Sequence, residues 1–187
     1  ELAKAVVSSG ALTSLVNCLE EFDPAVKENA AWALSYIARH NEELANMVVE
    51  AGAIPLLVLC VQEPEIGLKR IAASAMCEIA KQNAEMAQKL VDQRAVPFLA
   101  LLISHKDTQI KRQVCACLAQ IAKHRQELAE EVVNHNIFPK IFSLLKDQDQ
   151  VVRKNAATCI REIAKHSSEL SNTICNAGGS AALVEYI

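Results

Sequence analysis

The sequence predicts an all-α solenoid, a stack of repeats in which each repeat forms three helices. Three observations predict it. One motif recurs every 42 residues, apolar positions of the longest predicted helix follow a 3.6-residue period, and glycine or proline stands at matching corners of most copies. The recurring motif is a Glu-Leu-Ala-like triplet, found without insertion or deletion at 1–3, 43–45, 85–87, 127–129 and 169–171. In such an array each repeat buries its apolar face against its neighbours.

The triplets divide the chain into four complete repeats and one partial repeat. The complete repeats are 1–42, 43–84, 85–126 and 127–168, and the partial repeat is 169–187. We expect one continuous array over 1–187, because five glycines and five prolines are too few for a linker and fall mostly at matching corners. Neither end resembles the polar capping repeat that solenoids need, so we expect the chain to be a fragment of a longer array.

The first helix of a repeat is illustrated by residues 41–51. Asn41 can cap its start, apolar residues follow at spacings of three and four, and Gly52 supplies the left-handed conformation that ends it. Arg94 is the exception among the matching corner residues: either arginine adopts this conformation at a cost of about 1 kcal/mol, or the corner has a different shape. The corner residues are Gly10, Gly52, Arg94, Asn136 and Gly178.

The second helix is predicted to run from a proline in its first turn to about Val61 in the second repeat. The prolines are Pro55, Pro97 and Pro139. An acidic residue then opens the third and longest helix, and a basic residue follows four positions later. This spacing predicts weak pairs within each helix, between Asp23 and Lys27, Glu65 and Lys69, Asp107 and Lys111, and Asp149 and Arg153.

The third helix has an apolar stripe, which leaves positions 28, 29, 32, 36 and 39 of the first repeat on its exposed side. If the repeats stack, these positions and their equivalents line a groove along the array. The groove is therefore the candidate protein-binding site. Its candidate residues are Asn29, Trp32, Tyr36, Arg39, Arg70, Glu78, Lys81, Arg112, Gln120, Lys123, Lys154, Asn155, Glu162 and Lys165.

The formal charge is segregated onto this side of the third helices. The columns that begin at positions 28, 36 and 39 carry +2, −2 and +4, so they sum to +4 in a chain of net charge −3. This pattern favours an acidic protein partner. The basic residues of the column at 39 can also be explained by their favourable interaction with the negative C-terminal end of the helix dipole. The negative total argues against nucleic acid as the partner.

Other function classes find little support in the sequence. It contains none of the common nucleotide-binding, zinc-protease or hydrolase motifs, so we expect no enzyme, no small-molecule substrate, no cofactor and no metal site. The longest apolar runs fall far short of the ~20 residues of a membrane span, so no membrane partner is expected. Seven cysteines without a CxxC spacing predict buried, free thiols in a reducing compartment.

Three histidines recur at one position, the end of the third helix. They are His40, His124 and His166, and Gln82 fills the same position in the second repeat. A side chain in the last turn of a helix can bond carbonyls that lack a partner, and glutamine can replace histidine in that role. The column is therefore interpreted as hydrogen bonding rather than metal binding.

The segments 28–38 and 52–57 resemble the consensus of the armadillo-repeat family. This resemblance implies a right-handed armadillo-repeat superhelix that acts as a protein-interaction scaffold. The whole chain, especially 22–40, 62–75 and 154–166, is further similar to armadillo proteins of the axonemal central pair. That similarity implies a structural or adaptor role in motile flagella or cilia, a cytoskeletal location, and tubulin tails or central-pair proteins as partners.

The alternative is a soluble peptide-binding adaptor, similar to import receptors or catenins. Import receptors clamp a basic peptide with a ladder of groove tryptophans and asparagines. Here the column equivalent to the asparagines reads Tyr36, Glu78, Gln120 and Glu162, and the tryptophan column reads Trp32, Ser74, Ala116 and Thr158. Only one tryptophan of the ladder is present, so the sequence disfavours binding of that kind.

Overall fold

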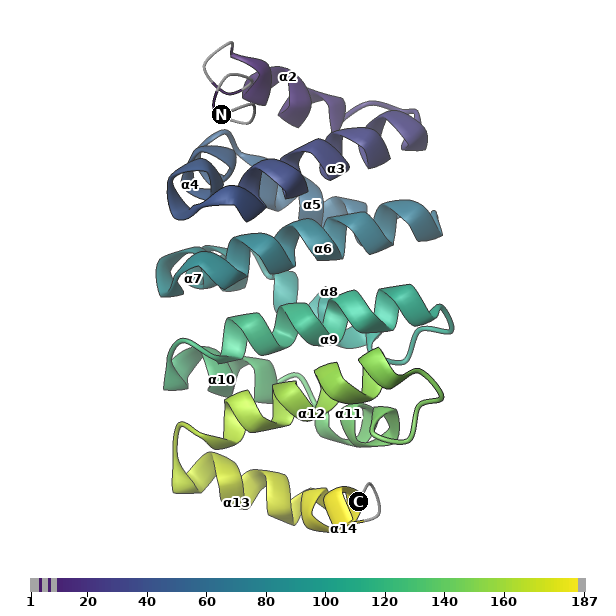
Figure 1. The fold of residues 1–187 in the computed structure, drawn as a ribbon, viewed down its shortest axis with the longest axis vertical. Coiled ribbons are helices and arrows are strands. Elements are labelled where there is room, and N and C mark those ends of the chain that lie inside the picture. Colours follow the sequence, from purple (N-terminus) through teal and green to yellow (C-terminus); the bar gives the residue numbers. More distant parts are fainter. Residues whose placement is uncertain (1–3, 5–6, 8–9, 185–187) are drawn as a thin grey trace.

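The computed structural model describes residue 4, residue 7 and residues 10–184. Within this part of the chain every regular element is a helix, which confirms the all-α class. The helices follow one another from the N-terminal end at the top of Figure 1 to the C-terminal end at the bottom. They are stacked as an α-solenoid, with each repeat packed on the one before it.

The helices come in threes, two short and one long. The short first helices are α4 (Glu42–Glu50), α7 (Ala84–Asp92), α10 (Gln126–Val133) and α13 (Ser168–Asn176). The short second helices are α2 (Ala11–Cys18), α5 (Ala53–Cys60), α8 (Ala95–Leu102), α11 (Phe138–Leu144) and α14 (Gly179–Val184). The long third helices are α3 (Pro24–His40), α6 (Ile66–Gln82), α9 (Thr108–Ala122) and α12 (Gln150–Ala164), and they lie side by side in Figure 1.

The predicted corners and caps are present. Asp23, Asp107 and Asp149 cap the long helices by accepting a backbone N–H, whereas Glu65 makes no such bond to α6. The corner residues between first and second helices have positive φ, and this includes two that are not glycine, Arg94 (58°) and Asn136 (53°). The corner at Arg94 therefore keeps the shape of the others and carries the backbone strain that the sequence predicts.

Replacing Arg94 by glycine is expected to raise the free energy of unfolding by about 0.5–1 kcal/mol, because relief of the left-handed strain exceeds the added flexibility of the unfolded chain. Lys89→Gly is the matched control, since it places glycine inside α7 and should lower stability by a similar amount. Urea denaturation followed by circular dichroism measures both changes. A loss of stability in Arg94→Gly would contradict the strain argument.

A single apolar core runs through the stack. Large side chains such as Leu34, Met76, Leu118 and Ile160 occupy one column of the long helices and are buried. Alanines fill many of the other buried positions of the long helices, which lets these helices pack closely against one another. The core is thus continuous from α2 to α14 and has no internal boundary.

All seven cysteines are free, as predicted, but their burial differs. Five are buried, and burial raises the pKa of Cys77 to about 12, which keeps this thiol protonated. Cys18 is half-buried and Cys175 is exposed, so the prediction of burial was wrong for Cys175. The equivalent Val49 lies beside α7 of the following repeat, whereas within residues 10–184 no helix lies in the corresponding place beside Cys175.

None of the described helices is both long and apolar enough to cross a membrane by itself. Helices α4 and α5 taken together are long and apolar enough, but the chain bends by 80° between them.

Candidate functional site

The candidate site is the surface formed by the outward side chains of α3, α6, α9 and α12, which we call the long-helix face. All fourteen predicted site residues lie on these helices or in the turn at their ends, and none is buried. Exposed are Asn29, Trp32, Tyr36, Arg39, Lys81, Lys154 and Lys165. Half-buried are Arg70, Glu78, Arg112, Gln120, Lys123, Asn155 and Glu162. The helical period therefore placed the columns correctly.

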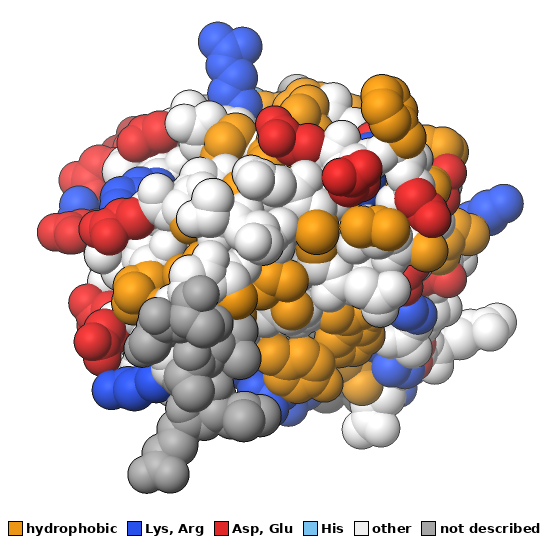
Figure 2. All heavy atoms as spheres, turned by 90° about the horizontal axis from the view of Figure 1, so that it is seen from above, with side chains coloured by type: hydrophobic (Ala, Val, Ile, Leu, Met, Phe, Trp, Pro, Cys, Tyr) orange, Lys and Arg blue, Asp and Glu red, His pale blue; other side chains and the backbone are white. Residues whose placement is uncertain are grey.

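Three side chains of α3 form an aromatic and cationic row on this face. The rings of Trp32 and Tyr36 stack with their centroids 5.5 Å apart, and the Arg39 guanidinium lies 5.3 Å from the centroid of the Tyr36 ring. Spacings of three and four residues bring them together on one side of the helix. Trp32 is 39% exposed and Tyr36 54% exposed, so both rings can contact a partner. Figure 2, seen from the N-terminal end, shows hydrophobic side chains at the surface beside charged ones.

A hollow of about 320 Å³ lies next to this row and joins three long helices. Trp32 of α3 lines it, with Arg70 and Ser74 of α6 and with Gln109 and Gln113 of α9. Ile71 forms an apolar part of its wall. The sequence did not single out the two glutamines, although they stand on the same exposed side of α9 as the predicted residues.

The structure neutralises part of the positive charge that the sequence placed on this face. Arg112 of α9 donates two bonds to the carboxylate of Asp149 in the next repeat, one of them 2.9 Å long from Nε to Oδ1. Lys165 pairs with Glu162, and Lys81 lies 3.5 Å from a carboxylate oxygen of Glu78. Glu78 and Glu162 are already counted in the predicted sum of +4, so of these three acids only Asp149 lowers it, from +4 to +3.

Four basic side chains of the long-helix face have no acidic partner among the described residues: Arg39, Arg70, Lys123 and Lys154. Lys123 bonds neutral groups instead, the Lys81 carbonyl at 2.9 Å and Gln120 Oε1 at 2.6 Å. Burial lowers the pKa of Lys123, and the charges of Lys81 and Lys165 lower it further. Contributions from Cys77 and from the Glu162 carboxylate, each smaller than that of burial, raise this pKa, and Glu162 is near but forms no ion pair with Lys123. The face thus carries positive charge that the described part of the chain does not compensate.

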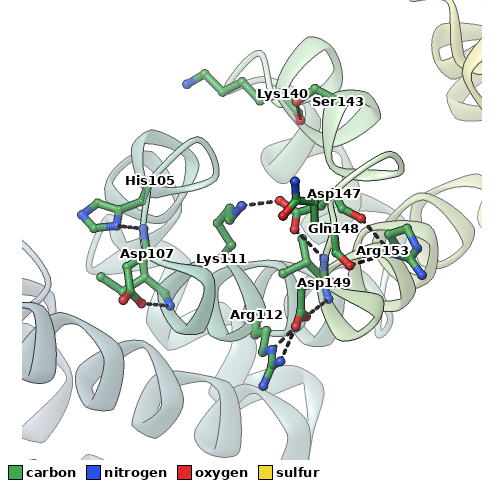
Figure 3. A network of polar contacts seen from close by, with 12 residues as sticks. His105, Asp107, Lys111, Arg112, Lys140, Ser143, Asp147, Gln148, Asp149 and Arg153 are labelled. Atoms are coloured by element: carbon green, nitrogen blue, oxygen red, sulfur yellow. Dashed lines mark hydrogen bonds and ion pairs between the residues drawn. The ribbon is translucent and has the colours of Figure 1, made fainter.

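A polar network joins α9 to the loop before α12 (Figure 3). Lys111 pairs with Asp147, Arg112 pairs with Asp149, and Arg153 donates to the carbonyls of Asp147 and Gln148. Burial raises the pKa of Asp147, but hydrogen bonds from Lys111 and from the Asp149 N–H outweigh it, so the net pKa is lowered. The network therefore ties the third and fourth repeats together through charge-assisted bonds.

The predicted pairs within the long helices were wrong. Lys27 lies 2.7 Å from Glu63 of the next repeat, and Lys111 pairs with Asp147 of the next repeat. Lys69 and Arg153 donate to backbone carbonyls of the loop before their own helix. Most of the acids four positions earlier are helix caps, so their carboxylates face backbone N–H groups instead.

The histidine column connects neighbouring long helices. His124 Nε2 lies 2.7 Å from the Ala80 carbonyl, His166 Nε2 lies 2.7 Å from the Ala122 carbonyl, and Gln82 Nε2 donates to the Ala38 carbonyl at 2.8 Å. Hydrogen bonding to carbonyls was predicted and is present. The acceptors, however, belong to the preceding repeat, so the column is a set of bonds between repeats. Among the residues described, no cluster of His, Cys, Asp and Glu could hold a metal ion.

We expect His124→Gln to make the stability of the protein less dependent on pH. Burial lowers the pKa of His124 below its ordinary 6.5, and nearby Lys123, Lys165 and Arg125 lower it further, despite the opposing bond to the Ala80 carbonyl. The unfolded state thus binds the proton more readily than the folded state. The stability that the folded protein gains from neutral His124 is therefore complete above the ordinary pKa and is lost as the pH falls below it, through the lower pKa of the folded protein. Glutamine keeps the bond, as Gln82 shows, and does not titrate.

The measurement is urea denaturation of both proteins between about pH 7.5 and about pH 5.5. The wild-type protein should lose more stability than the variant over this range. Both proteins keep the other histidines, so the difference between them reports His124 alone. Identical losses would show that protonation of His124 does not oppose folding.

Comparisons with known proteins agree with the geometry of the stack. The family described as Armadillo/beta-catenin-like repeat matches residues 1–39, and the family described as PIK3R4-like, middle domain, matches residues 54–178, about two thirds of the chain. No curated protein matches the sequence.

Several engineered proteins share the fold. A designed armadillo repeat protein in complex with the peptide (KR)4 is 27% identical with a TM-score of 0.95, and the match covers 98% of this chain and 77% of that one. Computationally designed armadillo repeat proteins for modular peptide recognition are 28% identical with a TM-score of 0.94, at coverages of 98% and 77%. Another engineered protein is 31% identical with a TM-score of 0.95, at coverages of 98% and 76%.

Proposed function

We propose that this chain, which belongs to the armadillo-repeat family, is a non-enzymatic scaffold that binds an acidic segment of a partner protein on its long-helix face. Over residues 54–178 it belongs to the family described as PIK3R4-like, middle domain. The observation that carries the proposal is the set of four basic side chains without acidic partners, in a chain whose net charge is −3. Such local segregation favours the encounter with an acidic segment.

The aromatic row gives the same face an apolar component. Trp32 and Tyr36 supply flat, exposed rings, and Arg39 adds a charge directly beside them. Aromatic residues and arginine are the side chains that most often dominate the energy of protein interfaces. An acidic segment with some apolar residues therefore fits this surface better than a purely charged one.

The more specific proposal is a role in the central-pair apparatus of motile cilia or flagella. Its support is the resemblance of residues 22–40, 62–75 and 154–166 to armadillo proteins of the axonemal central pair, such as sperm-associated antigen six. Glutamate-rich tubulin tails or acidic central-pair proteins would suit the basic long-helix face. This proposal places the protein in the cytoplasm, on the axonemal cytoskeleton.

A soluble adaptor for short peptides is the second candidate, and the designed neighbours favour it because their descriptions name peptide recognition and a complex with (KR)4. The long-helix face of this chain argues against a basic peptide as its ligand. Arg70 lines the hollow beside Trp32, where it would repel a lysine or arginine side chain. An acidic peptide is compatible both with the peptide-binding role of the designed proteins and with the positive charge of Arg70.

The proposal is tested by co-sedimentation with microtubules at low ionic strength. Arg70→Glu/Lys154→Glu should abolish or strongly reduce pelleting, because it reverses two charges that have no acidic partner among the described residues. Arg112 is left unchanged, since its pair with Asp149 joins two repeats. The control is Lys89→Glu/Lys106→Glu, which changes the net charge equally on residues outside the long-helix face.

Loss of pelleting in the first double variant but not in the control would support the proposal. Equal pelleting of all three proteins would remove the long-helix face as the binding surface. Raising the salt concentration should weaken wild-type binding, since screening acts on exposed charges.

A further inference from the structure

We infer that the hollow around Arg70 is a subsite for one carboxylate, and that it receives an aspartate or glutamate side chain of the bound acidic segment. This inference rests on the proposed function and names the part of the long-helix face that selects the ligand.

The junction between the second and third repeats lacks the ion pairs that the next junction has. Between the third and fourth repeats, Lys111 and Arg112 both bind carboxylates, those of Asp147 and Asp149. The equivalent basic residues one repeat earlier are Lys69 and Arg70. Lys69 bonds the carbonyls of Val61 and Glu63, and Arg70 has no polar partner among the described residues.

The loops that face the two junctions differ at one of the two positions that supply carboxylates to the later junction. His105 stands at the position equivalent to Asp147, so the carboxylate that binds Lys111 is missing opposite Lys69. Asp107 is equivalent to Asp149, and both cap their helices by accepting a backbone N–H at 2.9 Å, but no hydrogen bond or ion pair joins Asp107 to Arg70 among the described residues. Arg70 is therefore a half-buried guanidinium without the ion pair that the equivalent Arg112 makes.

The lining of the hollow suits a carboxylate side chain. Arg70 can donate two parallel hydrogen bonds, and the amides of Gln109 and Gln113 and the Ser74 hydroxyl can each donate another, so the hollow offers enough donors for the roughly four acceptor sites of one carboxylate. Trp32 and Ile71 offer apolar surface to the methylene groups of the same side chain. A hollow of about 320 Å³ holds such a group, and the positive charge excludes lysine and arginine.

Trp32 provides a direct measurement, because it is the only tryptophan in the chain and lines the hollow. Titration with a short polyglutamate peptide at low ionic strength should change its fluorescence, whereas polyglutamine of equal length should not. Arg70→Gln should weaken polyglutamate binding about tenfold, the effect of losing one charge-assisted hydrogen-bond pair. The affinity of Arg70→Lys for polyglutamate should lie between those of the wild-type protein and Arg70→Gln, since lysine keeps the charge but lacks the planar guanidinium.

Lys154→Gln is the matched control. Lys154 occupies the same column as Arg70 and is also unpaired among the described residues, but it does not line the hollow. Its loss should weaken binding less than about threefold, the effect expected of an exposed charge. Circular dichroism of each variant verifies that the helices are intact.

The outcomes separate this inference from the function on which it rests. If polyglutamate binds but Arg70→Gln and Lys154→Gln weaken it equally, the subsite is disproved and the acidic partner remains. If calorimetry detects no polyglutamate binding to the wild-type protein, or if polylysine binds better, the proposed function fails and the subsite with it.

Discussion

Replacing Leu118 by alanine will lower the free energy of unfolding by about 2–5 kcal/mol. Leu118 lies in the middle of α9, where α6 packs on one side and α12 on the other, and its side chain has no exposed surface. Its column continues as Leu34, Met76 and Ile160, so a cavity there would interrupt the core at its centre. The close packing of the neighbouring long helices limits how far they can relax into the space.

Leu101→Ala is the control for this substitution. It makes the same chemical change on α8, but Leu101 is 68% exposed, so its loss should alter stability by less than about 0.5 kcal/mol. Guanidinium denaturation monitored by circular dichroism compares the two variants with the wild-type protein. Similar losses in both would mean that the core does not run through α9 as described.

Lys111→Met is expected to cost about 2–3 kcal/mol near neutral pH, because it leaves the Asp147 carboxylate without its cation in a largely desolvated site. The side chains of Lys111 and Asp147 are only 14% and 13% exposed. The pKa of Asp147 is lowered in the folded protein, so the pair stabilises the fold above the ordinary carboxyl value of 3.8 and this stabilisation is lost as the pH falls below it. The variant should therefore lose less stability than the wild-type protein on acidification.

The matched control for this prediction is Lys69→Met, at the equivalent position one repeat earlier. Lys69 bonds only backbone carbonyls, so removing it leaves no unpaired carboxylate. It should cost clearly less than Lys111→Met, and it should not change the acid dependence of stability. Denaturation curves at neutral and acidic pH test both points, and equal costs for the two variants would contradict the importance of the Asp147 pair.

The features that follow local rules were predictable from the sequence. Gly52 and Arg94 at the corners, Asp107 and Asp149 as caps, and the outward columns of the long helices all depend on residues within one or two turns. Tyr36 and Lys154 could therefore be placed on the long-helix face without coordinates.

The contacts between repeats could not be predicted in the same way. Lys111 reaches a residue 36 positions later, and His124 reaches one 44 positions earlier, neither of which is the 42-residue period itself. These offsets depend on how far each long helix is displaced along its own axis relative to the next helix in the stack. The unpaired Arg70 in the hollow could not be predicted either, because Asp107 matches Asp149 in the sequence and yet forms no ion pair with Arg70 among the described residues.

The long helices of neighbouring repeats are joined by different kinds of bond along the two edges of the array, one edge formed by the C-terminal ends of these helices and the other by their N-terminal ends. At the C-terminal ends, Gln82, His124 and His166 bond carbonyls of the preceding helix, and bonds to uncharged carbonyls respond little to salt. At the N-terminal ends, ion pairs such as Lys27–Glu63 join the repeats, and salt weakens such partly buried pairs in part. Added salt should therefore weaken the second edge more than the first, so the array should bend more easily in one direction than in the other.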